Sequence, residues 1–367
     1  MNIHVVSLQV PYPADYGGAI DIFYKLKELR NEGFQIILHT YIYGREESPV
    51  LAQLCHEVHY YNRSSGFGKQ LSLLPYIVNT RTDKQLLDDL CRDDAPILFE
   101  GLHTCYLLDH PALRNRRKIV RMHNIEHKYY WQLAKQNPWS WKAIYYTIES
   151  LRLRWFEQKL KHASLICAIT KADKQELGRR YSTTEVIHLP CFFDAEFPET
   201  PQKTEPFVLY HGNLSVEENR RTAKYILEKI APKMPHVLFV IAGRNPDFKR
   251  IPQNAKVIDN PTDEYLLQLI STAHIHLMLT FQPTGIKLKL LNALVKGNGH
   301  IIANHDMLYG HSLGRFCTRA DSTKEIVSSI ERLMKEPMEP EERDLRKRII
   351  LKMKKAGISR LSLFNRY

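Results

Sequence analysis

The sequence lacks the cysteine pattern of a metal site or of a disulfide framework. Its six cysteines are scattered, and no two of them form a C-x-x-C pair. Scattered single cysteines are typical of proteins in the reducing cytoplasm. No apolar run approaches the roughly 18 residues that a transmembrane helix needs. The first ten residues have no basic segment before an apolar core, so we expect a first strand there and not a signal peptide.

Two further absences narrow the function classes. The chain has no G-x-G-x-x-G segment, so a dinucleotide-binding fingerprint is not supported. Its net charge of +12 favours an anionic partner: a nucleic acid, an anionic membrane surface or a phosphorylated substrate. Nucleic-acid binding rests on this charge alone, because no zinc finger or RNA-recognition signature accompanies it.

Strands and helices alternate along the 367 residues, which predicts two α/β domains with parallel sheets. The segment 190–206 is rich in proline, threonine and acidic residues, and we interpret it as a linker between the domains. Strands are expected at 3–10, 34–42, 56–61, 97–101, 118–123, 165–169 and 186–189 before the linker, and at 207–212, 237–242, 256–259, 274–279 and 300–303 after it. The clearest helices are expected at 20–32, 219–230 and 262–273.

A strand, a tight loop, a helix and a second strand follow one another in residues 274–303. Apolar residues at helical spacing predict the helix, and Gly297 and Gly299 end it. The loop lies at the carboxyl end of a strand, where open α/β sheets bind ligands, and the helix offers free N–H groups to an anion. Lys287 and Lys289 in the first turn indicate a phosphate ligand. Two solvated lysines on an exposed helix face are an equal alternative.

Two other segments allow two interpretations each. Gly17 and Gly18 stand at the entrance of the first expected helix, where glycines let a phosphate approach closely, although a plain turn is the commoner use of such a pair. The tract 128–162, broken at Pro138, mixes tryptophan and tyrosine with lysine and arginine. That composition suits a membrane interface, and the alternative is a core helix with a solvated basic face. The tail from Glu339 is also basic and is expected to be an amphipathic helix.

Five short motifs, in order along nearly the whole chain, resemble those of retaining GT-B glycosyltransferases of the family-4 type. Residues 11–20 resemble the amino-terminal glycine loop, and residues 122–126 resemble the "H-N-x-E" segment. Residues 210–219 resemble the opening of the donor domain, and residues 241–246 its "I-A-G-x-x-P" turn. Residues 284–293 resemble the "T-G-x-K-x-K-x-L-E-A" helix.

The resemblance implies an α/β protein with the GT-B fold, in which two Rossmann-like doubly wound domains face each other across a cleft. An acceptor-side domain would span 1–190, and a nucleotide-sugar-binding domain would span 206–335, with 191–205 as the linker. A basic helical tail, 336–367, would pack back toward the N-terminal domain.

The resemblance also implies a function. The protein would be a metal-independent glycosyltransferase of the hexosyl type, with no cofactor besides its nucleotide-sugar donor. It would move a sugar with retention to a glycan or polyprenyl-linked acceptor in cell-surface polysaccharide or glycoconjugate synthesis. The expected location is the cytoplasm, with peripheral attachment to an anionic membrane surface at the inner face, and no nucleic acid is expected as a partner.

Three residues carry the expected catalysis. His123, at the end of a strand, would contact the sugar; a strand-end histidine with a backbone partner is the alternative. Glu100, at the end of the preceding strand, is expected to face the acceptor. Lys287, nearest the helix start, is expected to be exposed and to stabilise the leaving diphosphate.

The expected donor-binding residues are Gly17, Gly18, Gly212, Asn213, Arg220, Arg244, Thr284, Gly285, Lys289 and Asn292. Arg220 could instead pair at the surface with Glu217 or Glu218. Asn292 departs from the family, which has a glutamate there that binds the ribose. An amide accepts a hydrogen bond without charge, so we expect weaker ribose binding. This keeps open a second hypothesis, a catalytically impaired GT-B scaffold that binds nucleotide or a protein partner.

Overall fold

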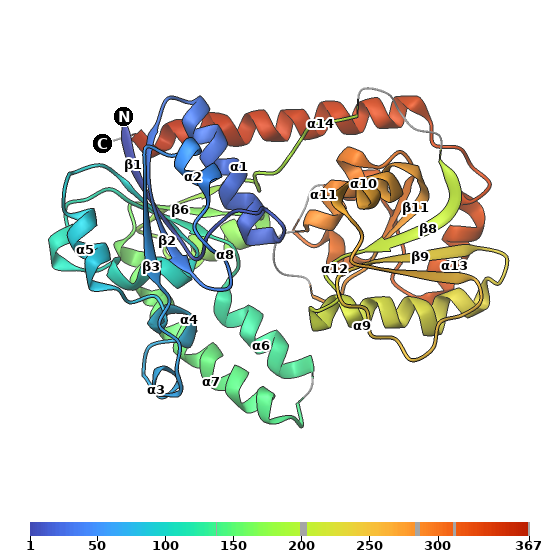
Figure 1. The fold of residues 1–367 in the computed structure, drawn as a ribbon, viewed down its shortest axis with the longest axis horizontal. Coiled ribbons are helices and arrows are strands. Elements are labelled where there is room, and N and C mark those ends of the chain that lie inside the picture. The colour runs from blue at the N-terminus through green and yellow to red at the C-terminus, as the bar shows by residue number, and fades with distance from the viewer. Residues whose placement is uncertain (137, 199–203, 283–286, 311–312, 366–367) are drawn as a thin grey trace. The chain divides into compact units, whose positions relative to one another are not determined.

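The computed structural model describes residues 1–136, 138–198, 204–282, 287–310 and 313–365. The chain forms two compact units. Unit 1 comprises Met1–Asp194 and Lys354–Tyr367, and unit 2 comprises Ala195–Met353. Each unit contains a sheet with helices packed beside it (Figure 1).

Unit 1 is built on a seven-stranded sheet with the strand order β3-β2-β1-β4-β5-β6-β7. Every neighbouring pair of strands is parallel. The direction in which the sheet grows reverses between β1 and β4, and doubly wound sheets bind their ligands at such a switch point. The strands are β1 (Asn2–Ser7), β2 (Gln35–Ile42), β3 (Glu57–Asn62), β4 (Ile97–Glu100), β5 (Lys118–Met122), β6 (Leu165–Ala168) and β7 (Glu185–His188).

Hydrophobic cores cover both faces of this sheet, because successive strand residues point to opposite faces. In β4, Phe99 belongs to one core and Leu98 to the other. The second core is completed by Leu361 and Phe364, from the end of the chain. The helices of unit 1 are α1 (Gly17–Asn31), α2 (Pro49–Leu54), α3 (Phe67–Gln70), α4 (Tyr76–Asn79), α5 (Lys84–Leu90), α6 (Glu126–Gln136), α7 (Trp141–Phe156) and α8 (Lys171–Arg180).

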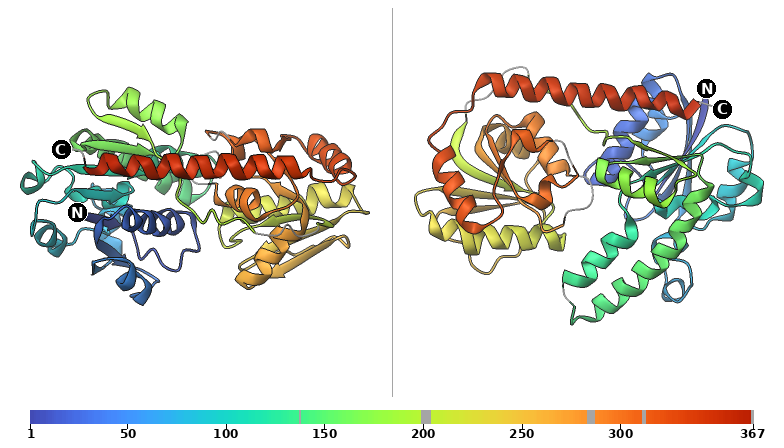
Figure 2. Two further views of the ribbon diagram at one scale, coloured as in Figure 1. Left: turned by 90° about the horizontal axis from the view of Figure 1, so that it is seen from above. Right: turned by 180° about the vertical axis from the view of Figure 1, so that it is seen from behind.

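Helices α6 and α7 form the connection between β5 and β6. The hydroxyl of Ser140 accepts a hydrogen bond from the backbone N–H of Ala143 at 3.3 Å and so caps the start of α7. The two helices pack along each other and stand out from the sheet of unit 1 (Figures 1 and 2). The helical tract expected over 128–162 is therefore a helical hairpin, and the break expected at Pro138 lies between its two helices.

Unit 2 repeats the topology of unit 1. Its six strands are also parallel and have the order β10-β9-β8-β11-β12-β13, which again reverses beside the first strand of the unit. The strands are β8 (Glu205–His211), β9 (Leu238–Gly243), β10 (Ala255–Asp259), β11 (Ala273–Met278), β12 (His300–Ala303) and β13 (Thr318–Arg319). The helices are α9 (Glu217–Tyr225), α10 (Asp263–Thr272), α11 (Leu288–Lys296), α12 (His305–Leu308), α13 (Thr323–Leu333) and α14 (Pro340–Ser359). The last six residues of α14 belong to unit 1.

The ends of β8 and β9 approach each other closely at a glycine. A Cβ atom added to Gly243 would lie 1.9 Å from the carbonyl oxygen of Gly212, so no other residue fits there without moving the backbone. This contact draws the loop after β8 toward the loop after β9. The glycine of the "I-A-G" motif therefore acts through packing at the carboxyl edge of the second sheet.

The α/β class with two Rossmann-like doubly wound domains is confirmed. The strand expected at 300–303 is present with those bounds, and the helix expected from residue 20 begins three residues earlier, at Gly17. The helix expected over 219–230 ends at Tyr225, and a π-helical turn, Ile226–Ile230, continues it. No helix in the described part of the chain is long and apolar enough to cross a membrane.

Candidate active site

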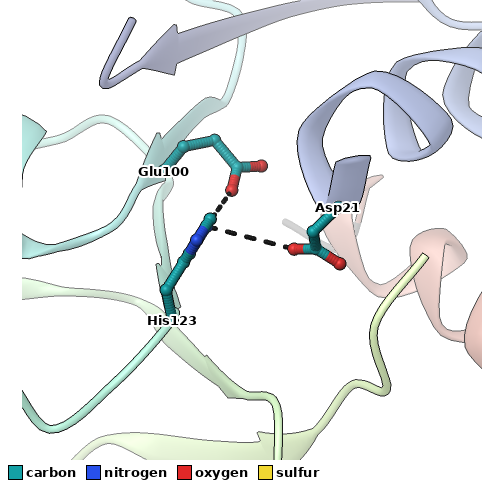
Figure 3. A group of neighbouring side chains, drawn as sticks. All are labelled: Asp21, Glu100 and His123. Atoms are coloured by element: carbon teal, nitrogen blue, oxygen red, sulfur yellow. Dashed lines mark hydrogen bonds and ion pairs between the residues drawn. The ribbon is translucent and has the colours of Figure 1, made fainter. Parts of the chain in front are cut away.

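Three polar side chains meet at the switch point of unit 1. His123 directly follows β5, Glu100 is the last residue of β4, and Asp21 lies on α1, the helix that follows β1. The Nε2 atom of His123 lies 2.9 Å from a carboxylate oxygen of Glu100 and 3.9 Å from one of Asp21 (Figure 3). All three side chains are buried. The alternative interpretation, a strand-end histidine with a backbone partner, is not what the structure has, because Nε2 of His123 pairs with the Glu100 carboxylate.

Lys25 and Arg121 balance the two carboxylates. The Lys25 amine lies 2.7 Å from Glu100 and 3.1 Å from Asp21. Arg121 donates to both oxygens of Asp21, from Nη2 at 3.0 Å and from Nε at 3.1 Å. Burial alone would raise the pKa of each carboxyl, but Arg121 and Lys25 lower that of Asp21, and Lys25 with His123 lowers that of Glu100. Both acids are therefore ionised, and each carboxylate has a cation of the network as its partner.

This network changes the role of Glu100. The expectation that Glu100 faces the acceptor is wrong, because its side chain is fully buried and both of its oxygens have partners. The ligand atoms of Asp21, Glu100 and His123 lie within 4.8 Å of one another, a spacing that could hold a metal ion. Lys25 already occupies the space between the two carboxylates, so a metal would have to displace an ammonium group there.

The hydrogen bond to Glu100 sets the orientation of the His123 ring. A carboxylate only accepts hydrogen bonds, so Nε2 carries a proton, and Nδ1 is the nitrogen that can accept a hydrogen bond when the ring is neutral. A Cβ atom at Gly18 would lie 3.7 Å from this Nδ1 and 3.1 Å from the ring of Tyr16. Gly17, the first residue of α1, directly precedes Gly18. The glycine pair therefore lies beside the histidine. The arrangement presents a hydrogen-bond acceptor next to a helix amino terminus.

Unit 2 places a lysine at its own switch point. The Lys289 amine, on α11, donates to the Tyr210 hydroxyl at 3.0 Å and to Asn219 Oδ1 at 2.9 Å. It also lies 4.8 Å from the centre of the Tyr210 ring, within cation–π range. Burial lowers the pKa of Lys289 to about 8.

Lys287 directly precedes α11 and is its N-cap residue. The expectation that Lys287 is exposed is wrong: its relative exposure is 6%, and its amine donates to the carbonyl oxygen of Gln282. Burial lowers the pKa of Lys287 to about 8. The alternative of a solvated lysine on an exposed helix face is therefore wrong for Lys287, whereas Lys289 is partly buried.

Glu218 on α9 is the acidic group that acts on both lysines. It raises their pKa values and so offsets part of the effect of burial. Its carboxylate also accepts a hydrogen bond from the Thr280 hydroxyl, just after β11. Asp306 also raises the pKa of Lys287, so burial outweighs the effect of the nearby carboxylates on this amine.

The other expected donor residues differ in where they lie. Gly212 directly follows β8, and Asn213 and Arg244 are exposed residues after β8 and β9. Asn292 lies partly buried on α11. Thr284 and Gly285 lie outside the described residues. Arg220 follows the surface alternative, because its guanidinium group pairs with Glu217 one turn away.

Sequence reasoning missed Asp21, Lys25 and Arg121, which hold His123 and Glu100 in place. A signal was present for each of them. Asp21 and Lys25 are an acid and a base four residues apart on a helix whose neighbouring positions are apolar. Arg121 lies within an apolar strand, where a buried charge needs a partner.

The chain was compared with known proteins. No protein-family model matches the sequence. A Klebsiella pneumoniae protein described as an "uncharacterized 44.6 kDa protein in cps region" is 25% identical over 370 residues, covering 89% of this chain and 93% of that protein. Its description assigns no activity.

Solved structures give a closer account of the fold. Sucrose-phosphate synthase from Thermosynechococcus elongatus superposes with a TM-score of 0.69 at 13% identity, over 99% of each chain. TarM superposes with a TM-score of 0.70 at 10% identity, over 100% of this chain and 99% of that one. The S. aureus TarM G117R mutant, solved with fondaparinux, α-GlcNAc-glycerol and UDP, gives 0.66 at 11% identity, over 100% of each chain. The protein thus has the GT-B fold of these sugar transferases.

Proposed function

We propose that the protein is a glycosyltransferase that moves a sugar from a nucleotide-sugar donor to a glycan or lipid-linked acceptor. We assign the donor to unit 2 and the acceptor to unit 1. The observation that carries the proposal is the pair of lysines at the start of α11, of which Lys287 is buried and Lys289 is partly buried. A sugar is transferred when the bond between its anomeric carbon and the diphosphate breaks, and cations that meet the departing diphosphate lower that barrier.

The lysine pair suits this role because it is desolvated before the donor arrives. Burial lowers the pKa of each amine, so a diphosphate beside them would replace favourable interactions that the amines lost on leaving water. Their described partners include neutral oxygens, from Gln282 and Tyr210, which hold the amines without cancelling their charge. The α11 amino terminus adds the positive end of a helix dipole. We propose that these groups neutralise the diphosphate without a metal ion.

We further propose that transfer proceeds with retention and without a covalent sugar–enzyme intermediate. Asp21 and Glu100 are fully buried and ion-paired, so neither carboxylate is available as a nucleophile. The acceptor oxygen would bond to the anomeric carbon as the bond to the diphosphate breaks, and the departing diphosphate oxygen would take the acceptor's proton. His123 would accept a hydrogen bond from a sugar hydroxyl at Nδ1, while Glu100 holds its Nε2.

Donor binding and slow donor hydrolysis test the proposal directly. We expect either UDP or GDP to bind in isothermal titration, and the matching nucleotide-sugar to be hydrolysed without an acceptor. Lys224→Ala is the matched control for a substitution of Lys287, because Lys224 is an exposed lysine on α9 whose partner is Glu228 at 3.8 Å. Absence of binding for every common nucleoside diphosphate would contradict the proposal.

A catalytically impaired scaffold is the second candidate function, and Asn292 is the observation in its favour. A carboxylate would accept charge-assisted hydrogen bonds from both ribose hydroxyls, and an amide oxygen gives weaker ones. A scaffold of this kind would still bind nucleotide at the lysines but would hydrolyse no nucleotide-sugar. The two candidates therefore separate on hydrolysis and not on binding.

We also propose that the protein acts at the cytoplasmic face of a membrane, bound through α7. Five apolar residues with spacings of three and four form an exposed stripe along this helix, and Trp139 precedes it with a relative exposure of 95%. Leu71 and Leu73 are also exposed, in the segment that Arg152 ties to α7 through the Gln70 carbonyl at 2.8 Å. The stripe residues are Trp141, Ile144, Ile148, Leu151 and Trp155.

The charge of α7 selects an anionic membrane as the partner. Lys142 and Arg154 are exposed, whereas the only acidic residue of the helix, Glu149, is buried and paired with Arg152 at 2.8 Å. Tryptophan beside lysine and arginine is the composition that binds at lipid headgroups. The basic tail contributes less than its composition indicates, because Arg346 pairs with Glu342, and Lys354 pairs with Glu28.

Sedimentation with lipid vesicles tests this surface. We expect binding to vesicles that contain anionic lipid, weaker binding to neutral vesicles, and release at high salt. Trp139→Ser with Trp155→Ser should abolish binding. Ile251→Ser, which removes an apolar residue that is 49% exposed in unit 2, should leave it unchanged. Equal recovery in the supernatant with both kinds of vesicle at low salt would contradict the proposal.

A further inference from the structure

Two arginines of unit 1 share a single hydroxyl group. Arg63 follows β3, and Arg81 follows α4. The Nε atom of Arg63 lies 3.1 Å from Thr80 Oγ1, and the Nη1 atom of Arg81 lies 3.4 Å from the same oxygen. Thr80 is fully buried. Two guanidinium groups of like charge are thus held side by side.

The pair has no acidic partner in the described parts of the chain. The remaining hydrogen bonds of Arg81 are to the carbonyl oxygens of Leu8 at 2.6 Å and Ile77 at 2.5 Å, and its relative exposure is 4%. Arg63 stacks on the Tyr43 ring at 4.0 Å. Burial, and then the charge of Arg63, lower the pKa of Arg81 to about 10. A buried charge is ordinarily paired, so this site is short of negative charge.

Unsatisfied polar atoms lie around the same two arginines. The Tyr16 hydroxyl and His103 Nδ1 are buried and have no hydrogen-bond partner among the described residues. A Cβ atom at Gly101 would lie 3.1 Å from His103 Nδ1 and 3.8 Å from the side chain of Leu8, whose carbonyl oxygen accepts from Arg81. Burial first, and then the charges of Arg81 and His123, lower the pKa of His103. Tyr16 immediately precedes the Gly17–Gly18 pair. These groups follow the carboxyl ends of the strands at the switch point, beside the histidine of the candidate site.

We propose that Arg63 and Arg81 bind a negatively charged oxygen group, a phosphate or a carboxylate, carried by the acceptor. An anion between the two guanidinium groups relieves their mutual repulsion and accepts their remaining N–H donors. Tyr16 and His103 supply further polar atoms around it. That the anion belongs to an acceptor rests on the proposed function, whereas the binding of an anion at this pair does not.

Isothermal titration with two simple probes tests the site. The probes are inorganic phosphate and glucuronate, with glucose as the uncharged counterpart of glucuronate, and each titration is run with and without saturating UDP. In the titrations with saturating UDP, the nucleotide occupies the α11 lysines, so that phosphate cannot bind there. We expect whichever of the two anions matches the site to bind, and glucose not to bind. Phosphate binding alone indicates a phosphorylated acceptor, and glucuronate binding alone indicates a uronic acid.

Arg63→Gln is the variant to use, because Arg63 is only partly buried, whereas Arg81 bonds to two backbone carbonyls. We expect it to weaken anion binding on the order of tenfold or more, the scale of a lost hydrogen bond to a charged group. Arg63→Lys should retain part of the affinity. Arg92→Gln is the matched control, since Arg92 is an exposed arginine paired with Asp89 at 2.6 Å.

The outcomes separate this inference from the proposed function. Anion affinity that is equal in the native protein and in Arg63→Gln, or that falls as much in Arg92→Gln, would overturn the inference. UDP binding with no effect of Arg63→Gln would overturn it and leave the proposed function standing. Anion binding that depends on Arg63, without any nucleotide binding or sugar hydrolysis, would support the anion site and contradict the transferase.

Discussion

The two units have the same strand order but treat charge differently at the same topological position. In unit 1, Asp21 and Glu100 are balanced by Lys25 and Arg121, and the result is a closed network around His123. In unit 2, Lys287 is buried and Lys289 is partly buried, and burial lowers the pKa of both amines although the Glu218 carboxylate acts against it. A network of paired charges orients a side chain, whereas desolvated lysines gain from a ligand of opposite charge. This difference is the reason that we assign the donor diphosphate to unit 2.

Breaking the balanced network should have the largest effect. Asp21→Asn removes the charge that holds Arg121 and Lys25, and it leaves a buried guanidinium group uncompensated. We expect the free energy of unfolding, measured with urea, to fall by about 3–5 kcal/mol. Asp88→Asn, at an exposed position of α5, should change it by no more than about 0.5 kcal/mol. A native-like midpoint for Asp21→Asn would show that the network does not stabilise unit 1.

Removing a cation from the lysine pair at α11 should affect turnover more than folding. We expect Lys287→Ala to lower the rate of sugar transfer or donor hydrolysis on the order of a hundredfold, as when one charge-stabilising donor is removed. Because Lys287 is buried, alanine also leaves a cavity, and Lys287→Met controls for volume by filling it without charge. Equal losses in both variants would identify charge as the cause. Unchanged nucleotide affinity in both would exclude the α11 lysines as the phosphate site.

The lysine pKa values predict a pH dependence of nucleotide binding. Each amine has a pKa of about 8 in the free protein and is protonated in the complex, so binding takes up protons as the pH rises past about 8. Affinity for UDP or GDP should therefore be flat between about pH 7, where the terminal phosphate is still doubly charged, and about pH 8, and fall above that by up to tenfold per pH unit for each lysine. Titrations at several pH values check this, and Lys287→Met should show the shallower fall. A flat profile from about pH 7 to about pH 9 would be inconsistent with lysine-bound diphosphate.

The smallest effect concerns the ribose. Asn292→Glu introduces the carboxylate that the family resemblance implies at this position, and we expect nucleotide to bind several-fold more tightly, on the scale of about 1 kcal/mol for a charge-assisted hydrogen bond. Asn292→Gln is the control, because it has the length of glutamate and no charge. Weaker binding of UDP and GDP to Asn292→Glu than to Asn292→Gln would mean that position 292 does not face the ribose.

The sequence predicted the architecture well because strand and helix signals are local. Gly297 and Gly299 isolate the strand 300–303 from the helix before it, and the expected bounds of that strand are the observed ones. Pro138 likewise marks the bend between α6 and α7. Each of these signals lies within a few residues of the structure that it determines.

The site could be predicted only in part, because the roles of its residues depend on distant partners. Glu100 ends a strand as expected, but Lys25, 75 residues earlier, turns its carboxylate inward. Lys289 is held by the Tyr210 hydroxyl, 79 residues away, so its burial does not follow from the pattern of α11. A helical pattern identifies the face on which a lysine lies, but it does not show what packs against that face.

The return of the chain to unit 1 has a consequence for synthesis on the ribosome. Leu361 and Phe364 complete a core that also contains Ile3 and Val5, whereas unit 2 is a continuous stretch, Ala195–Met353. Chains emerge from the amino terminus onward, and domains generally fold as units. All of unit 2 is therefore available to fold while unit 1, although begun first, still lacks part of its interior. Translation therefore starts with unit 1, but unit 2 can finish folding first.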